Sequence, residues 1–241
     1  MTTTHHPGWP VQLRLPGQAA APEGPIAMDA MYVMHHAFRR DLADFAAAAV
    51  ATPVDDRETW RALADRWADF AEILHDHHTG EDDGVWPFLT ERADAAGRET
   101  LEAMEAEHDE IDPLLEACAA GFDRLAATAD EDARAALAVR LVAARESLGR
   151  HLAHEETEAI ALIQQLMTPE EWHRIDEEFF KKRLSLRDFA RLVPWAAYGL
   201  SDAARRQAFA EVGKPFEVLW WLTRRGFGRR QHRAFAYLGR A

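Results

Sequence analysis

The chain has 241 residues, of which 48% are hydrophobic, and its net charge is −13. A chain of this length and composition can bury a large core, which excludes general disorder. The acidic balance argues against a general nucleic-acid binder, because phosphate contacts require lysine and arginine, and the single cysteine, Cys118, excludes an intrachain disulfide.

The first predicted helix follows an irregular N-terminal segment. Residues 1–26 contain five prolines and are expected to form no regular helix. From residue 27 to about residue 51, apolar residues recur with the three-and-four spacing of a buried helical stripe. His35 falls on this stripe. Taken alone, a histidine in such a place is either a hydrogen-bonded core residue or a ligand.

A long second helix is predicted from about residue 57 to residue 88. Its inner face begins with tryptophans and leucines and reaches His77. Histidines and acidic residues crowd its last turns, where Gly84 and Pro87 indicate that the helix loosens or ends.

Two further helices are predicted in the middle of the chain. The third covers about residues 98–127, with His108 on its inner face and Pro113 expected to kink it. The fourth begins after Asp130 and continues to about residue 167, and its inner stripe includes His151 and Glu155.

The C-terminal part is predicted to consist of shorter helices. Thr168 to Glu171 form a capping box with proline at the first helical position, which begins a fifth helix ending near residue 182. Further short helices are expected over residues 186–195, from residue 202, over residues 215–224 and over residues 230–238. No segment shows sustained two-residue alternation, so the predicted fold class is all-α. The chain is predicted to comprise an irregular segment (1–26), a helical bundle (27–168) and a helical extension packed on the bundle (169–241).

An internal repeat relates the two halves of the bundle. His35 and His77 are separated by 42 residues, and His108 and His151 by 43. His77 and Glu81 are four residues apart, as are His151 and Glu155, and this spacing puts both side chains on one face of a helix. Each half therefore supplies one lone histidine and one histidine–carboxylate pair.

This repeat predicts a metal site inside an antiparallel up-down four-helix bundle, because facing helices of a bundle can bring such residues to one level. Unpaired buried carboxylates would be costly without a cation. Nitrogen and oxygen ligands without thiolates favour iron or manganese over zinc. Six ligands are too many for one tetrahedral zinc and suit two ions bridged by both carboxylates. The predicted ligands are His35, His77, Glu81, His108, His151 and Glu155.

The same residues resemble a known family. His35, His77-x-x-x-Glu81-Asp82, Glu107-His108 and His151-x-x-His154-Glu155-Glu156 are similar, in order, to the motifs of the hemerythrin-like (HHE cation-binding) domain. The resemblance covers about residues 28–167 and implies a non-heme di-iron centre, with Glu81 and Glu155 as bridges. The C-terminal part loosely resembles the tail of actinobacterial-type members.

One position departs from the oxygen-carrying hemerythrins. These have a fifth histidine one turn beyond the third-helix histidine, where this chain has Asp112. With four histidines, both irons would keep open positions, which favours peroxide, nitric oxide or oxidation chemistry over oxygen carriage. His154 or His78 is an alternative fifth ligand; the repeat disfavours His154, because Gly80 occupies the corresponding place.

Other residues are predicted to support the ligands. Glu107, Asp82 and Glu156 are candidates to hold ligand imidazoles by their other N–H, or are ordinary surface acids. Tyr32 lies three residues before His35 and shares its face, so it is either a redox or hydrogen-bonding neighbour of the metals or a core aromatic residue.

The C-terminal end is basic. Residues 214–241 carry seven lysines and arginines against one glutamate, a net +6, which leaves −19 for the rest. The tail either folds onto the acidic bundle or contacts a partner or an anionic membrane through Trp220, Trp221 and its arginines.

The predicted function is a di-iron protein that binds or activates O2, peroxide or nitric oxide, with a small organic molecule as a further possible substrate. Redox enzyme activity is favoured, and the alternative is a gas or iron sensor that signals through its extension. No nucleic acid is expected as a partner. The N-terminus lacks a basic region followed by an apolar one, and no apolar run could span a membrane, so a cytoplasmic location is expected.

Overall fold

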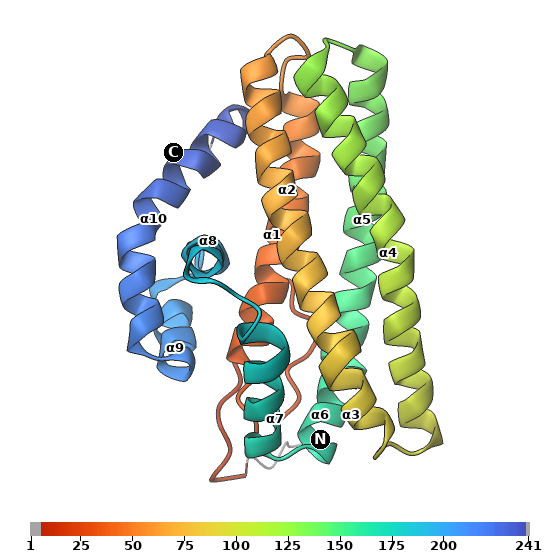
Figure 1. Cartoon of the computed structure of the whole chain (residues 1–241), viewed down its shortest axis with the longest axis vertical. Helices are drawn as coiled ribbons and strands as arrows, with labels where there is room; N and C mark the ends of the chain where they lie inside the picture. The colour runs from red at the N-terminus through yellow and green to blue at the C-terminus, as the bar shows by residue number, and fades with distance from the viewer. Residues whose placement is uncertain (1–5, 240–241) are drawn as a thin grey trace.

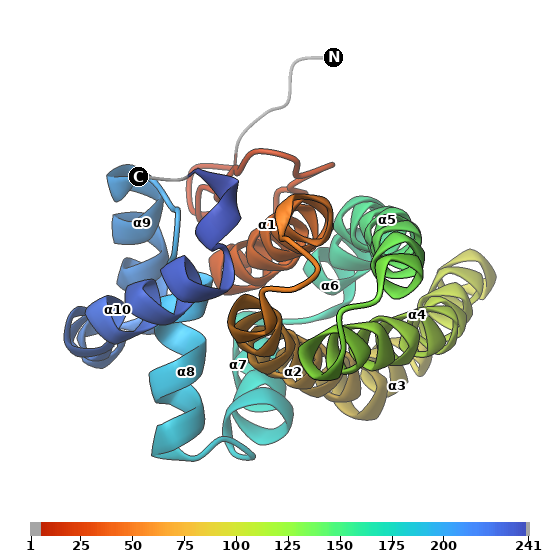
Figure 2. The same cartoon turned by 90° about the horizontal axis from the view of Figure 1, so that it is seen from above.

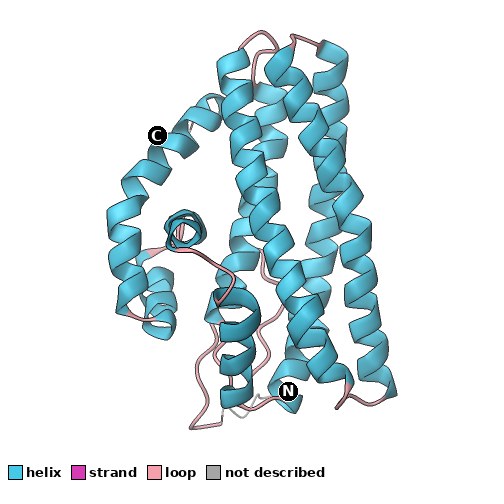
Figure 3. Cartoon of the chain, in the orientation of Figure 1, coloured by secondary structure: helices cyan, strands magenta, loops and turns pink. Residues whose placement is uncertain are grey.

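The computed structural model describes residues 6–239, which form helices and loops and, within that range, no strand (Figure 3). Four long helices run side by side along the long axis (Figure 1): α1 (Asp29–Ala51), α2 (Arg57–Gly80), α4 (Ala95–Ala127) and α5 (Glu131–His154). Their direction alternates along the chain, so the fold is the expected antiparallel bundle. In the view from above, α1, α2, α4 and α5 are seen nearly end-on and grouped together (Figure 2).

Local signals explain where these helices begin. Asp56, Asp94 and Asp130 each accept a hydrogen bond from a backbone N–H of the first turn of α2, α4 and α5, respectively. These caps satisfy N–H groups that have no partner within the helix. Pro113 lies inside α4, which continues on both sides of it.

Two of the long helices change geometry at equivalent points of the repeat. A π-helical turn, η1 (Glu81–Val85), follows α2 and leads into α3 (Trp86–Thr90). Another, η2 (Glu155–Ala159), follows α5 and leads into α6 (Ile160–Leu166). The second helix thus continues past Gly84 and Pro87 with a changed pitch. Each π-helical turn begins at a predicted bridging carboxylate, and such turns frequently mark functional sites.

The C-terminal helices cover the α1–α2 side of the bundle (Figures 1 and 2). They are α7 (Pro169–Ile175), the π-helical η3 (Asp176–Lys181), α8 (Leu186–Ala196), α9 (Asp202–Val212), α10 (Lys214–Ala234) and the 3-10 turn η4 (Ala236–Leu238). The prediction of separate helices over 215–224 and 230–238 was wrong, because α10 passes through Gly226 and Gly228 without a break. Neither glycine has a positive φ, so packing of α10 against α2 and α8 overrides their weak helix propensity.

Buried polar side chains connect this extension to the bundle. Asp41 on α1 accepts hydrogen bonds from Arg66 on α2 and from the Trp195 indole on α8 (2.7 Å to Nε1), and all three residues are buried. Arg66 also donates to Gln231 on α10 at 3.0 Å. By contrast, the basic residues of α10 form no ion pair with the bundle among the described residues. The extension therefore docks through buried groups and through ion pairs of Arg183 and Arg191 with acids of α2 and η1, while the arginines of α10 make no such pair among the described residues.

The core consists of two hydrophobic clusters. One contains Phe45, Trp67 and Phe122 near the α1–α2 connection, together with residues of α8 and α10. The other contains Tyr32, Trp86 and Ile160 and lies toward α3, α6 and the N-terminal segment. Cys118 is buried with a free thiol, as expected. The predicted metal ligands occupy the level between the two clusters, so apolar side chains close both ends of the site.

Candidate metal centre

The antiparallel helices bring all six predicted ligands together. His35 lies in the second turn of α1, His77 in the last turn of α2, His108 in the middle of α4 and His151 in the last turn of α5. All six side chains are buried, and both carboxylates are fully so. One group of four consists of residues whose ligand atoms lie within 4.8 Å of one another: His35, His77, Glu81 and Glu155.

Each carboxylate reaches histidines from both halves of the repeat. Glu81 places one oxygen 3.3 Å from His77 Nε2 and its other oxygen 3.6 Å from His108 Nε2. Glu155 places Oε2 3.1 Å from His35 Nε2 and 3.9 Å from His151 Nε2. This is the arrangement that two bridging carboxylates require.

A second group of three histidines lies beside the first. It consists of His108, His151 and His78, whose ligand atoms also lie within 4.8 Å of one another. The His108 and His151 Nε2 atoms are 3.1 Å apart, and the His78 ring stacks on the His108 ring with centroids 3.8 Å apart. His78 is thus the alternative fifth histidine that faces the site.

His154 and Asp112 lie elsewhere. The His154 side chain is 28% exposed, and its Nδ1 lies 2.9 Å from Glu107 Oε1, outside both groups. Asp112 is exposed on α4. The additional histidine beside His108 and His151 is therefore His78 of α2. Neither Asp112 of α4 nor His154 of α5 takes that place.

Three carboxylates hold the other ring nitrogen of three candidate ligands. Glu156 Oε1 lies 3.0 Å from His35 Nδ1, Asp82 Oδ1 lies 2.9 Å from His108 Nδ1, and Glu107 Oε2 lies 2.9 Å from His151 Nδ1. A carboxylate on Nδ1 keeps the proton there and leaves Nε2 free to bind a metal. The three acids predicted for this role are therefore placed for it.

Arg39 is a supporting residue that the sequence reasoning missed. It donates to both oxygens of Glu156, at 2.6 and 3.0 Å, and the Ala19 backbone N–H donates to Glu156 Oε2 at 2.7 Å. Arg39 follows His35 by four residues, so the shared helix face was the signal that could have identified it.

Several inward-facing atoms of the site form no hydrogen bond that meets normal geometry among the described residues. Nε2 of His35, Nε2 of His77 and all four oxygens of Glu81 and Glu155 are buried without a hydrogen bond. Both ring nitrogens of His78 share this condition. Buried polar groups are normally hydrogen-bonded, and leaving so many unsatisfied is unfavourable unless a cation fills the space.

The pKa values of three of these side chains are shifted by burial and by their charged neighbours. Burial and the neighbouring Glu155 raise the pKa of Glu81 well above its usual value. Burial lowers the pKa of His77 to about 3, which favours the neutral imidazole that binds metals. For His35, burial acts in the same direction, but Glu155 and Glu156 outweigh it and raise the pKa to about 9. The donor set thus fits divalent cations in chemistry and burial.

Tyr32 lies close to this charged site. Its hydroxyl is buried without a hydrogen-bond partner among the described residues, and burial together with Glu156 and Glu155 raises its pKa. Trp86 is buried in the same hydrophobic cluster as Tyr32.

Comparison with known proteins agrees with this geometry. The family model described as the Hemerythrin HHE cation binding domain matches residues 27–163, more than half of the chain. The searches of curated proteins and of solved structures give no match. Among the described residues, no helix combines the length and apolarity needed to cross a membrane.

Proposed function

Because the chain belongs to the hemerythrin HHE cation-binding domain family, we propose that its bundle holds two non-heme iron ions. The proposed ligands are His35, His77, Glu81, His108, His151 and Glu155, with manganese as the alternative metal. The observation that carries this proposal is the pair of fully buried, unpartnered carboxylates, each within 4 Å of histidines from both halves of the repeat.

His78 is proposed as a fifth histidine ligand. Its support is its burial, its two unpartnered ring nitrogens and its position beside His108 and His151. The resulting site is asymmetric: three histidines serve one ion, and two, His35 and His77, serve the other. The His35–His77 side then keeps more open coordination, so small ligands would react there.

When bound, such a centre would supply electron exchange with O2, peroxide or nitric oxide. Redox turnover was favoured for a site with four histidines; with His78 as a fifth ligand, reversible O2 binding is the second outcome that the test below distinguishes. The protein's own residues prepare the site in three ways. Apolar side chains around it exclude water, the acids on Nδ1 orient three imidazoles, and the Tyr32 hydroxyl is a buried proton donor without another partner among the described residues.

The test is iron content followed by reaction under controlled gas. Purified protein is loaded anaerobically with Fe(II), and spectra are recorded after O2, peroxide or nitric oxide is added. We expect about two irons per chain, fast spectral changes and repeated turnover with at least one oxidant. His77→Ala and Glu155→Ala should lower the iron content. Full iron content in both variants would refute the proposed site.

A sensor is the second candidate, and one contact favours it. Phe180 and Phe179 of η3 pack directly against Gly80 and Gly84, which flank Glu81 on α2 and η1. A change at the metal centre could therefore be transmitted to the extension. Gas-dependent protease protection of residues 185–241, with a lasting spectral change and no turnover, would favour the sensor over the enzyme.

A further inference from the structure

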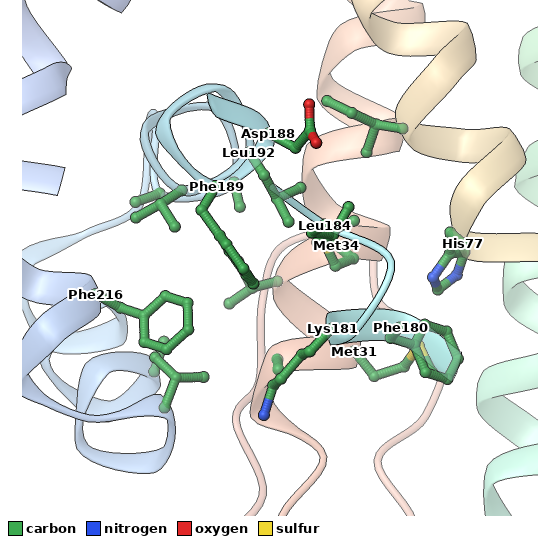
Figure 4. A pocket seen from close by; sticks show the side chains of 18 of the residues that line it. Met31, Met34, His77, Phe180, Lys181, Leu184, Asp188, Phe189, Leu192 and Phe216 are labelled. Carbon is green, nitrogen blue, oxygen red and sulfur yellow. The ribbon is translucent and has the colours of Figure 1, made fainter. Parts of the chain in front are cut away.

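An apolar pocket lies between the bundle and its C-terminal extension. Its volume is about 210 Å³, and its lining comes from α1, α2, η3, α8, α9 and α10. Figure 4 shows Met31, Met34, Leu192 and Phe216 around this space, with His77 at one edge. A pocket of this kind, apolar with few polar groups, is typical of a site for a small organic molecule.

His77 joins this pocket to the proposed metal centre. Its Nε2 lies 3.3 Å from Glu81, on the metal side of the ring. The other three paired histidines, His35, His108 and His151, each place Nδ1 against a carboxylate. In the described part of the chain, the one carboxylate within ion-pair distance of His77 is Glu81, which faces Nε2, so Nδ1 has no such acid, and the residue lines the pocket.

This difference gives the pocket a neutral hydrogen-bond donor, in addition to the charged side chains in its lining. A neutral imidazole that binds a metal through Nε2 carries its proton on Nδ1, which is then a hydrogen-bond donor. A donor at the edge of an apolar space is satisfied by water or by a ligand oxygen that displaces the water.

The charges of the lining exclude an anionic ligand. All three lysines and arginines that line the pocket already pair with acids: Lys181 with Asp176 and Glu177, Arg191 with Asp69 and Glu72, and Arg205 with Asp202. A carboxylate entering the pocket would lose its hydration without gaining a free cation.

We propose that this pocket binds an uncharged, mainly apolar alcohol or carbonyl compound whose oxygen accepts a hydrogen bond from His77 Nδ1. The proposal rests on the proposed metal function, because metal binding at Nε2 places the proton on Nδ1. An apolar cavity of about 150 Å³ holds benzene, so this pocket fits a somewhat larger molecule, such as a medium-chain alcohol. The ligand would lie beside the more open side of the metal centre.

The binding test uses three probes with the same chain and different head groups. Metal-loaded full-length protein is titrated calorimetrically with octanol, octanoate and octylammonium. We expect saturable binding of one octanol per chain, with both ions binding at least about tenfold more weakly because of the cost of burying their charge. Absence of octanol binding, or equal binding of either ion, would overturn the proposal.

Matched variants locate the binding site. Leu184→Trp fills the pocket, whereas Val218→Trp places the same side chain on α10 outside it, at a position that is 58% exposed. Leu184→Phe is a milder replacement if the tryptophan disturbs folding. Octanol binding should be lost in the Leu184 variants and retained in Val218→Trp. Loss in both positions, or in neither, would contradict the assigned site.

A spectroscopic readout tests the hydrogen bond itself. Cobalt-loaded protein should change its visible bands when octanol binds, because a hydrogen bond at Nδ1 alters the donation of His77 to the metal. The change should be absent in Leu184→Trp. Octanol binding without any spectral change would refute the His77 contact. Metal content is measured on the same samples, so failure to bind metal is distinguished from failure of the pocket.

Discussion

At the scale of single residues, Asp82, Glu107 and Glu156 determine how the candidate ligands are oriented. Each holds the Nδ1 atom of one histidine, and Glu156 is itself held by Arg39 and the Ala19 N–H. Such outer contacts restrict the ring orientation and strengthen the metal-binding nitrogen.

Glu156→Gln should weaken metal binding without removing a ligand. The charge that orients His35 is lost, and changes of this type reduce metal affinity by roughly 10- to 100-fold. A chelator competition assay measures the effect. Glu158→Gln is the matched control, because among the described residues Glu158 contacts only His154, which lies outside both ligand groups, and Thr100, and its side chain is 55% exposed. Equal affinities in both variants would contradict this role of Glu156.

Asp41→Asn should destabilise the protein strongly. Arg66 is 4% exposed and would keep a buried charge without its carboxylate, which costs about 3–5 kcal/mol of unfolding free energy. Denaturant unfolding at neutral pH measures the loss, and the exposed Asp112→Asn is the control. A loss below about 1 kcal/mol would show that the pair is dispensable.

The pH dependence of the same contact has a definite sign. Burial alone would raise the pKa of Asp41, but Arg66 and Arg40 outweigh it and lower the pKa below 3.8. A lowered folded-state pKa gives stability that is present above pH 3.8 and is lost as the pH falls toward the folded-state value. The wild-type protein should therefore lose more stability than Asp41→Asn does when the pH falls below 3.8; equal losses would argue against the shift.

At the scale of elements, the contact between η3 and the second helix explains two glycines. A Cβ at Gly84 would lie 2.5 Å from Phe179 Cγ, and one at Gly80 would lie 2.6 Å from Phe180 Cε1. Both distances are too short for real atoms, so the phenylalanines occupy space that only glycine leaves open.

Gly84→Ala and Gly149→Ala should have opposite effects on stability. Replacing a helical glycine by alanine normally stabilises by about 0.5–1 kcal/mol. Gly149 has open space around its Cα, so its variant should gain stability. Gly84→Ala should lose stability and expose residues 176–185 to protease, because Phe179 must move. Equal shifts in the two melting temperatures would contradict the close packing of η3.

At the scale of the whole molecule, bundle and extension share one core. Trp195 and Phe227 of the extension belong to the same hydrophobic cluster as Phe45 and Trp67 of the bundle. Together with the buried Asp41–Arg66–Gln231 contacts, this cluster makes independent unfolding of the extension unfavourable.

Calorimetry should therefore show one cooperative unfolding transition for the full chain. Metal bound only by the folded state stabilises it, by about 2.7 kcal/mol when the free metal exceeds the dissociation constant a hundredfold. The single transition should move to higher temperature with added Fe(II) under anaerobic conditions. Two transitions, of which only one responds to metal, would show that the extension unfolds separately.

The features that could be predicted from the sequence were those set by residues close together in the chain or related by the internal repeat. The helices of the bundle, the repeat and the set of six candidate ligands followed from spacings of three, four and about 42 residues along the chain. Helical periodicity is a local property, and antiparallel packing of repeated helices brings equivalent positions to one level.

The repeat disfavoured His154, but only the tertiary structure showed that His78 faces the site. His78 and His154 have similar local surroundings in the sequence, but the rotation of α2 and α5 in the bundle turns His78 inward and His154 toward Glu107. Gly84 and Pro87 indicated a change in the second helix near the π-helical turn at Glu81, but no local signal indicated the turn at Glu155.

In the extension, too, local features could be predicted from the sequence and features that depend on packing could not. Its caps and amphipathic spacing were sufficient to predict helices, but not the continuity of α10, the buried Asp41 contacts or the pocket beside His77. The Asp41–Trp195 contact and the pocket join residues more than 100 positions apart, and all of these features depend on how whole helices pack. The sequence by itself thus determined a helical bundle with a candidate metal centre, whereas the packing of the extension determined what lies beside that centre.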